Sequence, residues 1–445
     1  PRPNIVLILS DDHSYPHLGC YQNPDIHTPN LDGLAAAGLR CDRAYVGCPQ
    51  CVPSRATLMT GRSAVGLGMT RFTAPLPREV VTLPELLREA GYFTGIAGRT
   101  FHLDGSGKQP PESDEVLVAN GLRTFDKRVD FLRQGSMLPQ FQEFLGALPA
   151  DRPFFLWLNS SDPHRPLDDN NIPQPHDPSK LTLPVHYPDT PLVREDFARY
   201  YNEINRLDGH VGEVLKSLDQ RGLAGNTLVV FMGDNGSSQL RGKGTLYEFG
   251  IHVPLLLRWP QVIKAGTATT ELLSGEDLAP TLLAAAGVAA PPTMTGRSFL
   301  PLLRGESYTP RTELFAERGA HGGGLPTNSA NFDLGRAVVT PTHKLIYNAL
   351  WHLPYTPVDF GNDPFWKDLQ AQHAAGKLPA ELSQVYFRPQ RPMFELYDLA
   401  ADPREFNNLA GKPECQAIEH DLKSRLQRWM ILERDYLPLP IPPKR

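Results

Sequence analysis

The amino-acid sequence of 445 residues predicts an α/β fold, in which helices flank a large and mostly parallel sheet, followed by a smaller α+β unit. Short all-apolar runs, typical of strands buried on both faces, alternate with longer segments of helical periodicity, and this alternation indicates a doubly wound sheet. Past about residue 305 the pattern changes to short strands separated by loops, which indicates an antiparallel sheet. The chain is also too long for one ordinary core. We therefore expect two domains, at residues 1–305 and 306–445.

The apolar runs of the first domain each end in polar residues. These runs are residues 4–9, 92–97, 154–158 and 227–232. The first run is followed by Asp11 and Asp12, and the last by Asp234 and Asn235. Ligands bind outside the carboxyl ends of the strands in open α/β sheets, so we expect these side chains to meet at one ligand-binding edge.

Helix signals and turn residues mark the segments between the strands. Thr28 is a capping residue, Pro29 fits the first helical position, and Gly38 ends that helix. A long amphipathic helix is expected over residues 194–221. The Pro-rich segment 165–192 has too little periodicity for a core element and is expected to be a long functional loop. The strands expected in the second domain and its C-terminal helix are residues 313–317, 337–339, 344–347, 395–398 and 414–434.

Composition and charge exclude several classes of protein. The chain is 40% apolar and 21% charged, as soluble globular proteins are, and no run approaches the roughly 18 to 20 apolar residues that cross a bilayer. A net charge of −5 argues against a general nucleic-acid or membrane-surface role. Five cysteines do not build a disulfide framework and leave the compartment open. No leader precedes the first strand, so we expect a soluble protein that is cytoplasmic, or periplasmic, secreted or lysosomal if a leader was removed.

Residues 51–62, Cys-Val-Pro-Ser-Arg-Ala-Thr-Leu-Met-Thr-Gly-Arg, combine a nucleophile with an expected helix start. Pro53 fits the first helical turn, which places Cys51 at a helix N-terminus, where unpaired N–H groups and the helix dipole favour an anion. The guanidinium of Arg55, one turn further on, suits an oxyanion. Two other interpretations of Cys51 are a buried structural cysteine and, with Cys48, a redox pair or half of a zinc site, although the chain has no second Cys-x-x-Cys.

Asp11, Asp12, Asp234 and Asn235 offer three carboxylates and one amide oxygen at the expected sheet edge. Oxygen ligands of this kind suit a hard divalent cation, and their number and loose arrangement favour Ca²⁺ over Mg²⁺ or Mn²⁺. Taken alone, each half of this set is weak, because an Asp-Asn-Gly sequence after a strand is usually a turn.

The stretch 51–62 resembles, at nearly every position, the signature of the type I sulfatases of the alkaline phosphatase superfamily, Cys-x-Pro-Ser-Arg-x-x-x-Leu/Met-Thr-Gly-Arg. The resemblance implies an alkaline phosphatase-like fold and conversion of Cys51 to formylglycine, whose hydrate is the nucleophile. It also implies that Asp11, Asp12, Asp234 and Asn235 hold the cation together with an oxygen of residue 51. A formylglycine-generating enzyme is then a partner during maturation.

Further residues match this family segment by segment. Gly98-Arg99-Thr100-Phe101-His102 resembles the Gly-Lys-x-Phe-His segment of the iduronate-type sulfatases, with Arg99 in place of the lysine. His164 matches the second family histidine, and Lys243 matches the lysine that contacts the sulfate. The roles that the resemblance implies are nucleophile activation for Arg55 with the cation, sulfate binding for Lys243 and Arg99, and proton transfer for His164 and His102.

Several stretches over nearly the full length resemble heparan N-sulfatase (sulfamidase) within this family. They are residues 151–156, 162–165, 345–350, 365–369, 395–399, 402–405 and 408–409. This resemblance implies a sulfated sugar such as N-sulfoglucosamine as the substrate, with an N-sulfo or an O-sulfo group. The alternatives are an arylsulfatase or a phosphonate or phosphate ester hydrolase of the superfamily, and a non-catalytic binder of sulfated glycans whose Cys51 stays unmodified.

Residues that contact the sugar are expected from three segments. These are residues 165–192, 69–74 and 318–333, the last with His321 and three glycines. The sequence allows a homo-oligomer without determining one.

Overall fold

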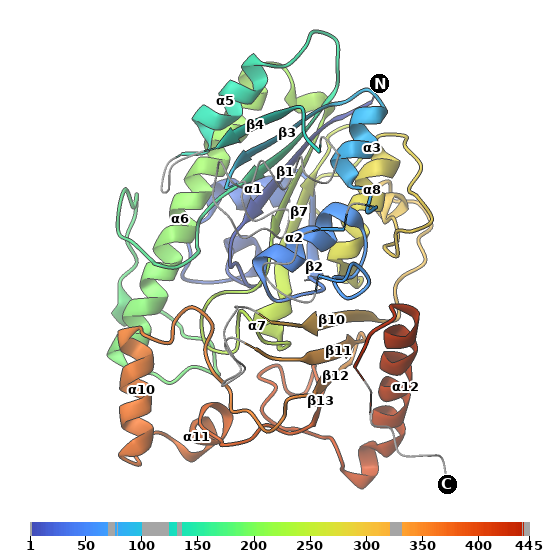
Figure 1. The fold of residues 1–445 in the computed structure, drawn as a ribbon. Coiled ribbons are helices and arrows are strands. Elements are labelled where there is room, and N and C mark those ends of the chain that lie inside the picture. Colours follow the sequence, from blue (N-terminus) through green and yellow to red (C-terminus); the bar gives the residue numbers. More distant parts are fainter. Residues whose placement is uncertain are drawn as a thin grey trace.

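The protein, a computed structural model, consists of a large and a small β-sheet with helices packed on them (Figure 1). The structure describes residues 2–69, 76–77, 79–99, 124–130, 136–320, 332–437 and 439. The strands are β1 (Asn4–Ser10), β2 (Leu39–Tyr45), β3 (Phe93–Gly98), β4 (Lys127–Asp130), β5 (Phe154–Asn159), β6 (Thr227–Gly233), β7 (His252–Arg258), β8 (Thr267–Thr269), β9 (Leu273–Ser274), β10 (Leu314–Arg318), β11 (Gly335–Val339), β12 (His343–Asn348) and β13 (Phe394–Asp398). The α-helices are α1 (Pro29–Ala36), α2 (Cys51–Thr60), α3 (Leu83–Glu89), α5 (Leu138–Gly146), α6 (Pro191–Gln220), α7 (Glu248–Ile251), α8 (Leu278–Ala285), α9 (Leu300–Leu303), α10 (Pro364–Ala374), α11 (Ala380–Tyr386) and α12 (Gln416–Leu432).

The large sheet has the strand order β4-β3-β5-β1-β6-β7-β2-β8, and β9 pairs with β2. All strands from β4 to β6 in this order are parallel. Strand β7 is antiparallel to both of its neighbours, and β2 then pairs in parallel with β8 and β9. A mostly parallel sheet between helices is the architecture that the alternating sequence pattern predicts, so this prediction is confirmed.

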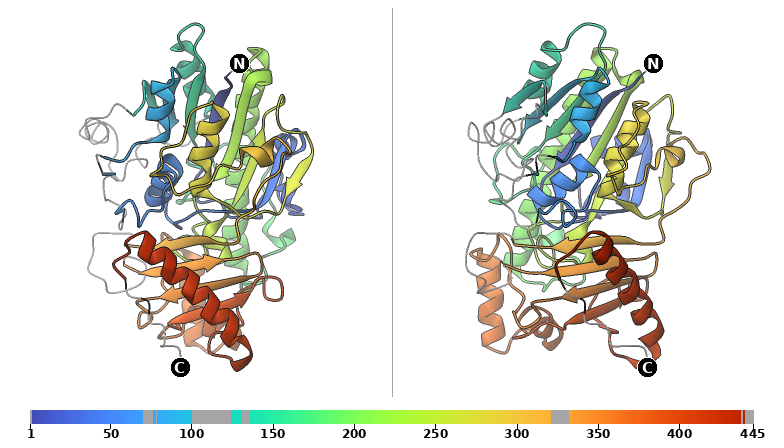
Figure 2. Two further views of the ribbon diagram at one scale, coloured as in Figure 1. Left: turned by 90° about the vertical axis from the view of Figure 1, so that its right-hand side faces the viewer. Right: turned by 45° about the vertical axis from the view of Figure 1, so that its right-hand side comes forward.

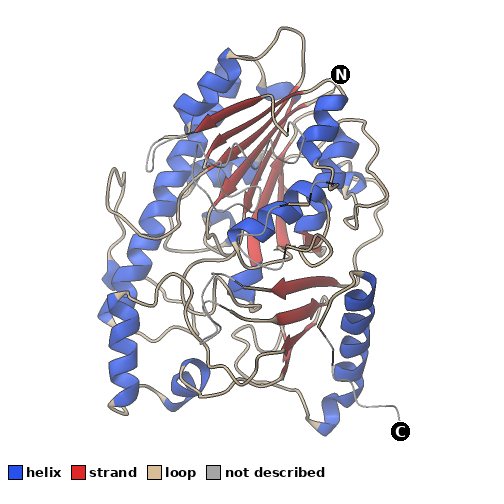
Figure 3. Ribbon diagram, viewed as in Figure 1, coloured by secondary structure: helices blue, strands red, loops and turns tan. Residues whose placement is uncertain are grey.

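Both faces of the large sheet are buried. In β1, Ile5 and Leu7 belong to one apolar cluster while Val6 and Ile8 belong to another, because successive side chains of a strand point to opposite faces. Helices α2, α3 and α8 contribute to the first cluster, and α1, α5 and α6 to the second (Figure 3). With both faces covered, the strand ends are where polar groups can gather.

The small sheet is antiparallel throughout, in the order β10-β11-β12-β13. Helix α12 packs on it, and Leu422 and Leu426 of this helix share an apolar cluster with Val338 and Leu345. Figure 2 shows the small sheet beyond one end of the large sheet. The antiparallel sheet with its C-terminal helix is as expected, and the domain boundary at residue 305 stays a prediction.

A buried ion cluster joins α7 to the small sheet. Lys344 Nζ lies 2.6 Å from Glu248 Oε1 and 2.9 Å from Glu405 Oε1. Glu248 Oε2 accepts a hydrogen bond from the Tyr45 hydroxyl and contacts His252 Nδ1. Glu405 Oε2 accepts one from the backbone N–H of Glu248. We call Lys344, Glu248 and Glu405 the joint cluster.

The first turn of α1 is capped differently from the sequence prediction. Thr28 occupies the N-cap position but makes no side-chain capping bond. Asp208 of α6 takes this role, because its carboxylate accepts hydrogen bonds from the backbone N–H groups of Asn30 and Leu31 at 3.2 and 2.7 Å. A carboxylate from a distant helix thus does what a local hydroxyl is expected to do.

The segment expected as a loop contains one short 3-10 turn, Pro178–Lys180, before α6 begins at Pro191. Within the described ranges, none of the helices has the length and apolar character that a membrane crossing requires.

Candidate active site

The acidic residues that follow β1 and β6 meet at one edge of the large sheet. The two strands are parallel neighbours, and the last residue of one pairs with the last residue of the other. The backbone N–H of Asp12 donates to Asp234 Oδ1 at 3.0 Å, and Asn235 Nδ2 donates to Asp12 Oδ1 at 2.8 Å. Asp11 lies beside them, and all four side chains are fully buried. The structure therefore brings the predicted cation ligands together.

Cys51 is the first residue of α2 and faces these carboxylates. Its Sγ lies 3.5 Å from Asp11 Oδ1 and 3.8 Å from Asp12 Oδ1. Burial raises the pKa of the thiol well above its usual value, although Lys243 opposes the shift. The sulfur is therefore protonated at neutral pH.

Arg55 lies one turn further along α2 and holds the acidic residues in place. Its Nε and Nη2 both lie 2.9 Å from Asp234 Oδ2, and Nη2 is 3.1 Å from Asp11 Oδ2. Nη1 donates to Asn159 Oδ1 at 3.0 Å. Arg55 therefore orients Asp234 and Asn159 through hydrogen bonds from Nε and Nη1, and neutralises Asp11 and Asp234 through the ion pairs of Nη2.

Two further cations reach the same carboxylates. Arg99, directly after β3, contacts Asp11 Oδ2 through Nη1. Lys243 Nζ lies 3.0 Å from Asp12 Oδ1, and the backbone N–H of Gly244 donates to Pro49 O at 2.8 Å, which ties the lysine loop to the start of α2. Both predicted anion-binding residues thus contact the carboxylates that Cys51 faces, whereas His102 falls outside the described residues.

His164 lies at the edge of this cluster, and the backbone of the next residue holds its ring. Its Nε2 lies 3.7 Å from Asp12 Oδ2, and its Nδ1 contacts the carbonyl oxygen of Arg165. A carbonyl oxygen only accepts, so the neutral ring carries its proton on Nδ1 and turns the lone pair of Nε2 toward the site. Burial, with the nearby charges of Lys243 and Arg99, lowers the pKa of His164 to about 3.

Arginine bridges fix the loop that carries His164. Arg206 of α6 lies 2.7 Å from Asp162 Oδ1 through Nη2, and the carbonyl oxygen of Asp162 accepts from the backbone N–H of Asp11 at 3.1 Å. Arg165 Nη2 lies 2.6 Å from Asp196 Oδ2, and its Nη1 bonds Asp363 at the start of α10. The histidine is therefore positioned from α6 and from α10 together.

The three buried carboxylates repel one another although three cations contact them. Burial, with the neighbouring carboxylates, raises the pKa of Asp12 to about 7 although Lys243 opposes this. Burial and Asp11 raise the pKa of Asp234 to about 6 against the effect of Arg55. Burial acts in the same direction on Asp11, but its cationic neighbours, Arg99 first, outweigh burial and lower its pKa.

The donor set fits a divalent cation. Ligand atoms of Asp11, Asp12, Cys51 and His164 all lie within 4.8 Å of one another. The amide oxygen of Asn235 is buried, and it has no hydrogen-bond partner in the described part of the chain. A cation would satisfy this acceptor and reduce the repulsion between the neighbouring carboxylates.

Sequence reasoning missed two residues that complete the site. Asn159, the last residue of β5, binds Arg55, and a polar residue at the end of an apolar strand is the signal that could have found it. Asp359 Oδ2 lies 2.8 Å from Lys243 Nζ and comes from the segment between β12 and α10, where no local pattern points to a site. Of the segments expected to contact the sugar, Met69 is buried at 2% exposure, while residues 70–74 and His321 lie outside the described residues.

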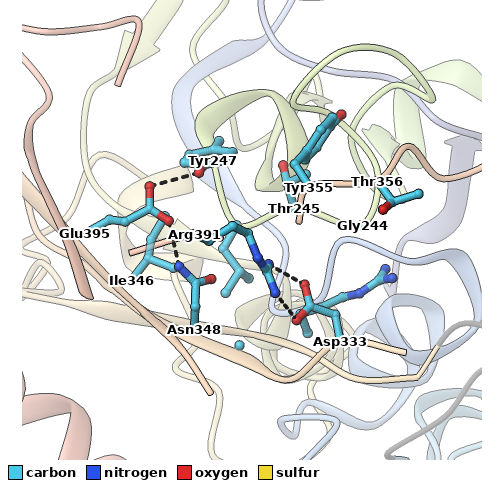
Figure 4. Close-up of a pocket in the computed structure, with 13 residues that line it drawn as sticks. Gly244, Thr245, Tyr247, Asp333, Ile346, Asn348, Tyr355, Thr356, Arg391 and Glu395 are labelled. Atoms are coloured by element: carbon cyan, nitrogen blue, oxygen red, sulfur yellow. Dashed lines mark hydrogen bonds and ion pairs between the residues drawn. The ribbon is translucent and has the colours of Figure 1, made fainter. Parts of the chain in front are cut away.

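A cavity of about 30 Å³ separates the segment after Lys243 from the small sheet (Figure 4). On its walls Arg391 forms two bonds to Asp333, at 2.7 and 2.8 Å. Glu395 accepts from the Tyr247 hydroxyl at 2.8 Å and from Asn348 Nδ2 at 2.6 Å. Arg391 is thus paired with Asp333, Glu395 has two hydrogen-bond donors, and the space suits one or two water molecules. We therefore assign this cavity to the contact between the segment after Lys243 and the small sheet.

Comparison with known proteins gives the family. The chain matches the family described as "Sulfatase" over residues 3–288, more than half of its length. The chain belongs to the sulfatase family. Residues 236–364 of this sulfatase also match the region described as "N-sulphoglucosamine sulphohydrolase, C-terminal". The protein is therefore a hydrolase of sulfuric esters or sulfamates, as the signature at Cys51 predicts.

Several curated proteins resemble this sulfatase over most of their length. N-sulphoglucosamine sulphohydrolase of Homo sapiens is 30% identical to it, over 96% of this chain and 90% of its own. An ulvan-active sulfatase of Formosa agariphila is 29% identical, over 99% of this chain and 76% of its own. Arylsulfatase A of Homo sapiens is 36% identical over 70% of each chain.

Solved structures share the alkaline phosphatase-like fold. A protein in complex with its substrate D-glucosamine-2-N,6-O-disulfate superposes with a TM-score of 0.72 at 22% identity, covering 98% of this chain and 99% of its own. Phosphonate monoester hydrolase of Agrobacterium radiobacter superposes with a TM-score of 0.74 at 20% identity, covering 97% and 96%. At these identities the likeness shows the fold alone, and it confirms the predicted fold class.

Proposed function

We propose that this sulfatase removes a sulfo group from a sulfated sugar, with N-sulfoglucosamine as the first candidate. The observation that carries the proposal is the convergence of Arg99, Lys243 and the N-terminus of α2 on the carboxylates beside Cys51. Such an arrangement suits a tetrahedral oxyanion. The similarity to human N-sulphoglucosamine sulphohydrolase, over 96% of the chain, supports the sugar and the sulfamate linkage.

We infer that Cys51 is the precursor of the nucleophile. Its raised pKa keeps the thiol protonated, and a protonated thiol is a weak nucleophile. Conversion to formylglycine, by a formylglycine-generating enzyme as the partner in maturation, supplies a hydrated aldehyde with an oxygen nucleophile instead. It also replaces the sulfur of residue 51 by oxygen, and hard oxygen ligands favour Ca²⁺ over softer metals.

Asp11, Asp12 and Asn235 are the residues proposed to hold the cation, with Asp234 and residue 51 completing the set. When bound, a divalent cation lowers the pKa of a hydroxyl group and attracts a sulfate oxygen. Arg55 contributes by fixing Asp11 and Asp234, so that their carboxylates need no rearrangement on binding.

The remaining residues act on the sulfate and on the leaving atom. Lys243 and Arg99 are proposed to bind the sulfate oxygens and to stabilise the charge that grows on them. A bound sulfate offsets the two charges that lower the pKa of His164, so the ring can take up a proton at Nε2 and pass it to the leaving atom. The corresponding role of His102 stays a prediction.

A substrate panel tests this proposal. Protein made together with a formylglycine-generating enzyme is assayed on N-sulfoglucosamine, 4-nitrophenyl sulfate and an aryl phosphonate monoester. We expect the highest kcat/KM on N-sulfoglucosamine and no turnover by Cys51→Ala on any of the three. A preference for the phosphonate would contradict the substrate class, and elemental analysis of the active protein identifies the metal.

Arylsulfatase activity is the second candidate, because human arylsulfatase A is 36% identical over 70% of the chain. A higher kcat/KM on 4-nitrophenyl sulfate than on N-sulfoglucosamine would favour it. A third possibility, a non-catalytic binder of sulfated glycans, is separated by the mass of the peptide that contains residue 51, since formylglycine is about 18 Da lighter than cysteine. An unchanged mass in protein made with the modifying enzyme would support the binder.

A further inference from the structure

One carboxylate of the site comes from the segment between β12 and α10. Asp359 Oδ2 lies 2.8 Å from Lys243 Nζ and 4.0 Å from His164 Nε2. The Asp359 side chain is 27% exposed, whereas Asp12, which contacts the same two residues, is fully buried. Lys243 and His164 therefore each contact an inner carboxylate and an outer one that solvent or substrate can reach.

Buried neighbours hold Asp359 in an unusual backbone conformation. Its φ is +70°, in the left-handed region that residues other than glycine rarely adopt. Val358 and Phe360 on either side are 3% and 0% exposed. Phe360 stacks on Phe365 with ring centroids 5.3 Å apart. A polar residue held this way between two apolar anchors is positioned by the fold rather than by its own preference.

The Asp359 segment is also connected to both residues that its carboxylate contacts. Asp363, four residues later, bonds Arg165, which directly follows His164. Tyr355, four residues earlier, lines the cavity in Figure 4, and its hydroxyl accepts from the backbone N–H of Arg241 at 3.2 Å. A Cβ added to Gly244 would come within 2.5 Å of Val358 Cγ2, so the chain after Lys243 packs directly on this segment.

A carboxylate at this position opposes the binding of an anion. The sulfo group is negatively charged, and its repulsion by Asp359 costs affinity unless another part of the substrate brings a donor or a positive charge. Asp359 contacts both Lys243, on the side of the sulfate oxygens, and His164, the residue proposed to protonate the leaving atom. Lys243 offsets part of the repulsion, and the leaving group, which meets His164, is the part of the substrate that can offset the rest.

We propose that Asp359 is a specificity-determining residue that favours nitrogen over oxygen as the leaving atom, an inference that rests on the proposed function. In sulfamate hydrolysis an oxygen of the hydrated residue 51 adds to sulfur and the S–N bond breaks, and one water is consumed overall when the hydrate is restored. The electron pair of the S–N bond stays on nitrogen, which in the net reaction takes both protons of that water and leaves as a primary ammonium, while sulfate leaves as a dianion. Asp359 stabilises the positive charge as it forms.

A sulfate ester gives a different charge at the same place. When the S–O bond of a sugar sulfate breaks, the leaving oxygen takes one proton of the water and departs as a neutral alcohol, and the second proton goes to solvent. The 4-nitrophenyl ester releases a phenolate and gives both protons to solvent, so neither ester forms a positive charge. Asp359 then has a hydrogen bond to accept but no charge to stabilise. The same carboxylate therefore acts differently on the two substrate classes.

Asp359→Asn tests this assignment, because it keeps the shape of the side chain and removes its charge. We expect kcat/KM to fall by about 10- to 100-fold for N-sulfoglucosamine and by less than about 3-fold for 4-nitrophenyl sulfate. Asp368→Asn on α10 is the matched control, since it removes the same charge away from Lys243 and His164, and both rates should stay unchanged. Asp359→Ser, which also removes the carboxylate, is a second variant in case the amide disturbs the turn, and calorimetry checks that each variant is folded.

Inhibition by products gives a readout that does not depend on turnover of the sulfamate. D-glucosamine is an ammonium at neutral pH, and N-acetylglucosamine is neutral. In Asp359→Asn the inhibition constant of glucosamine should rise about tenfold while that of N-acetylglucosamine stays the same. Equal losses on both substrates with unchanged glucosamine inhibition would overturn the proposal and leave Asp359 as a positioning residue for Lys243.

The failure of this inference is distinguishable from that of the proposed function. If the wild-type protein hydrolyses neither substrate, the proposed function fails. Calorimetric titration of glucosamine into the wild type and Asp359→Asn then still decides the role of Asp359, and equal affinities would count against it.

Discussion

The active-site cluster and the joint cluster are both buried groups of carboxylates and cations, but they differ in how completely their atoms are paired. In the joint cluster Lys344 is shared by Glu248 and Glu405, and the remaining carboxylate oxygens contact a hydroxyl, an imidazole or a backbone N–H. In the active-site cluster the amide oxygen of Asn235 has no partner within the described ranges. Of the two clusters, the active-site cluster is therefore the one with an acceptor that a ligand could use.

The electrostatics of the two clusters are more alike than their hydrogen bonding. In the joint cluster, Lys344 and His252 outweigh burial and lower the pKa of Glu248, whereas burial raises the pKa of Glu405 in spite of Lys344. In the active-site cluster, cationic neighbours outweigh burial and lower the pKa of Asp11, whereas burial and neighbouring carboxylates raise the pKa of Asp12 to about 7. Each cluster thus holds a carboxylate of each kind, and the amide oxygen of Asn235, without a partner among the described residues, is what distinguishes the active site.

The largest difference between the clusters is expected at residue 51. Cys51→Ala should lower kcat/KM for 4-nitrophenyl sulfate by more than about 10⁴-fold, because loss of the nucleophile leaves only binding and charge stabilisation. Cys48→Ala is the matched control, since Cys48 is also buried, at 2% exposure, three residues earlier. Its activity should stay within about twofold of the wild type. Turnover that survives in Cys51→Ala would place the chemistry elsewhere.

The second-largest effect is expected from removal of divalent cations, which should act on the active-site cluster and leave the joint cluster unchanged. Treatment with EDTA is expected to lower kcat/KM by about 10³-fold, and Ca²⁺ should restore it. The melting temperature should fall as well, because a ligand at 100 times its Kd contributes about 2.7 kcal/mol. Asn235→Ala should need at least about tenfold more Ca²⁺ for half-maximal activity. If EDTA changes neither activity nor melting temperature, the active-site cluster binds no cation.

Lys344→Met should act on stability without acting on catalysis. Two buried carboxylates lose their shared partner, so the free energy of unfolding should fall by about 3 kcal/mol in urea denaturation. The kcat/KM of the folded fraction should stay within about twofold. Lys180→Met is the control, because that side chain is 81% exposed and solvent screens its ion pair with Asp177, so the free energy of unfolding should stay nearly unchanged. A loss of activity at unchanged stability would mean that the joint cluster takes part in catalysis.

The smallest expected effect is on the pH dependence of stability, to which Asp12 and Glu248 contribute with opposite signs. The pKa of Asp12 in the folded, cation-free protein is raised to about 7 from 3.8, so its contribution is fully present below pH 3.8 and is lost as the pH rises through about 7. The pKa of Glu248 is lowered from 4.5, so its contribution is present above pH 4.5 and is lost as the pH falls through the lowered value.

Melting temperatures between pH 5 and 8 measure this difference. Without Ca²⁺ the protein should lose about 1 to 3 kcal/mol of stability as the pH rises over this range, and saturating Ca²⁺ should remove the loss because the cation stabilises the ionised carboxylates. Asp12→Asn should make it smaller, while Asp234, whose pKa is raised to about 6, still contributes. A loss of equal size in Asp12→Asn would assign the dependence to other groups.

The part of the fold that the sequence predicts is the part whose signals are local. Strands β1, β5 and β6 are unbroken apolar runs, and each was expected within a residue or two. Strand β2 was not expected, because charged residues interrupt its apolar ones. Strand β7 contains Pro254, which sits where the pairing of β7 with β2 changes register, so the sheet tolerates a residue that argues against a central strand.

The candidate site divides in the same way. Cys51 and Arg55 belong to one helix start, and the acidic residues follow two recognisable strands, so their meeting could be predicted. Asp359 reaches Lys243 only because the segment after β12 packs on the lysine loop, and Asp208 caps α1 only because α6 crosses it. Contacts of this kind depend on tertiary packing, which no local pattern encodes.

The complete burial of residue 51 sets an order of events in the synthesis of the protein. Cys51 has no exposed surface, and all ten residues of α2 are buried. On the proposed function, a modifying enzyme must reach this side chain before α2 packs against the large sheet. A chain that folds first would keep its thiol in the core. The yield of active protein should then depend on whether modification or folding comes first, and slower folding should raise it.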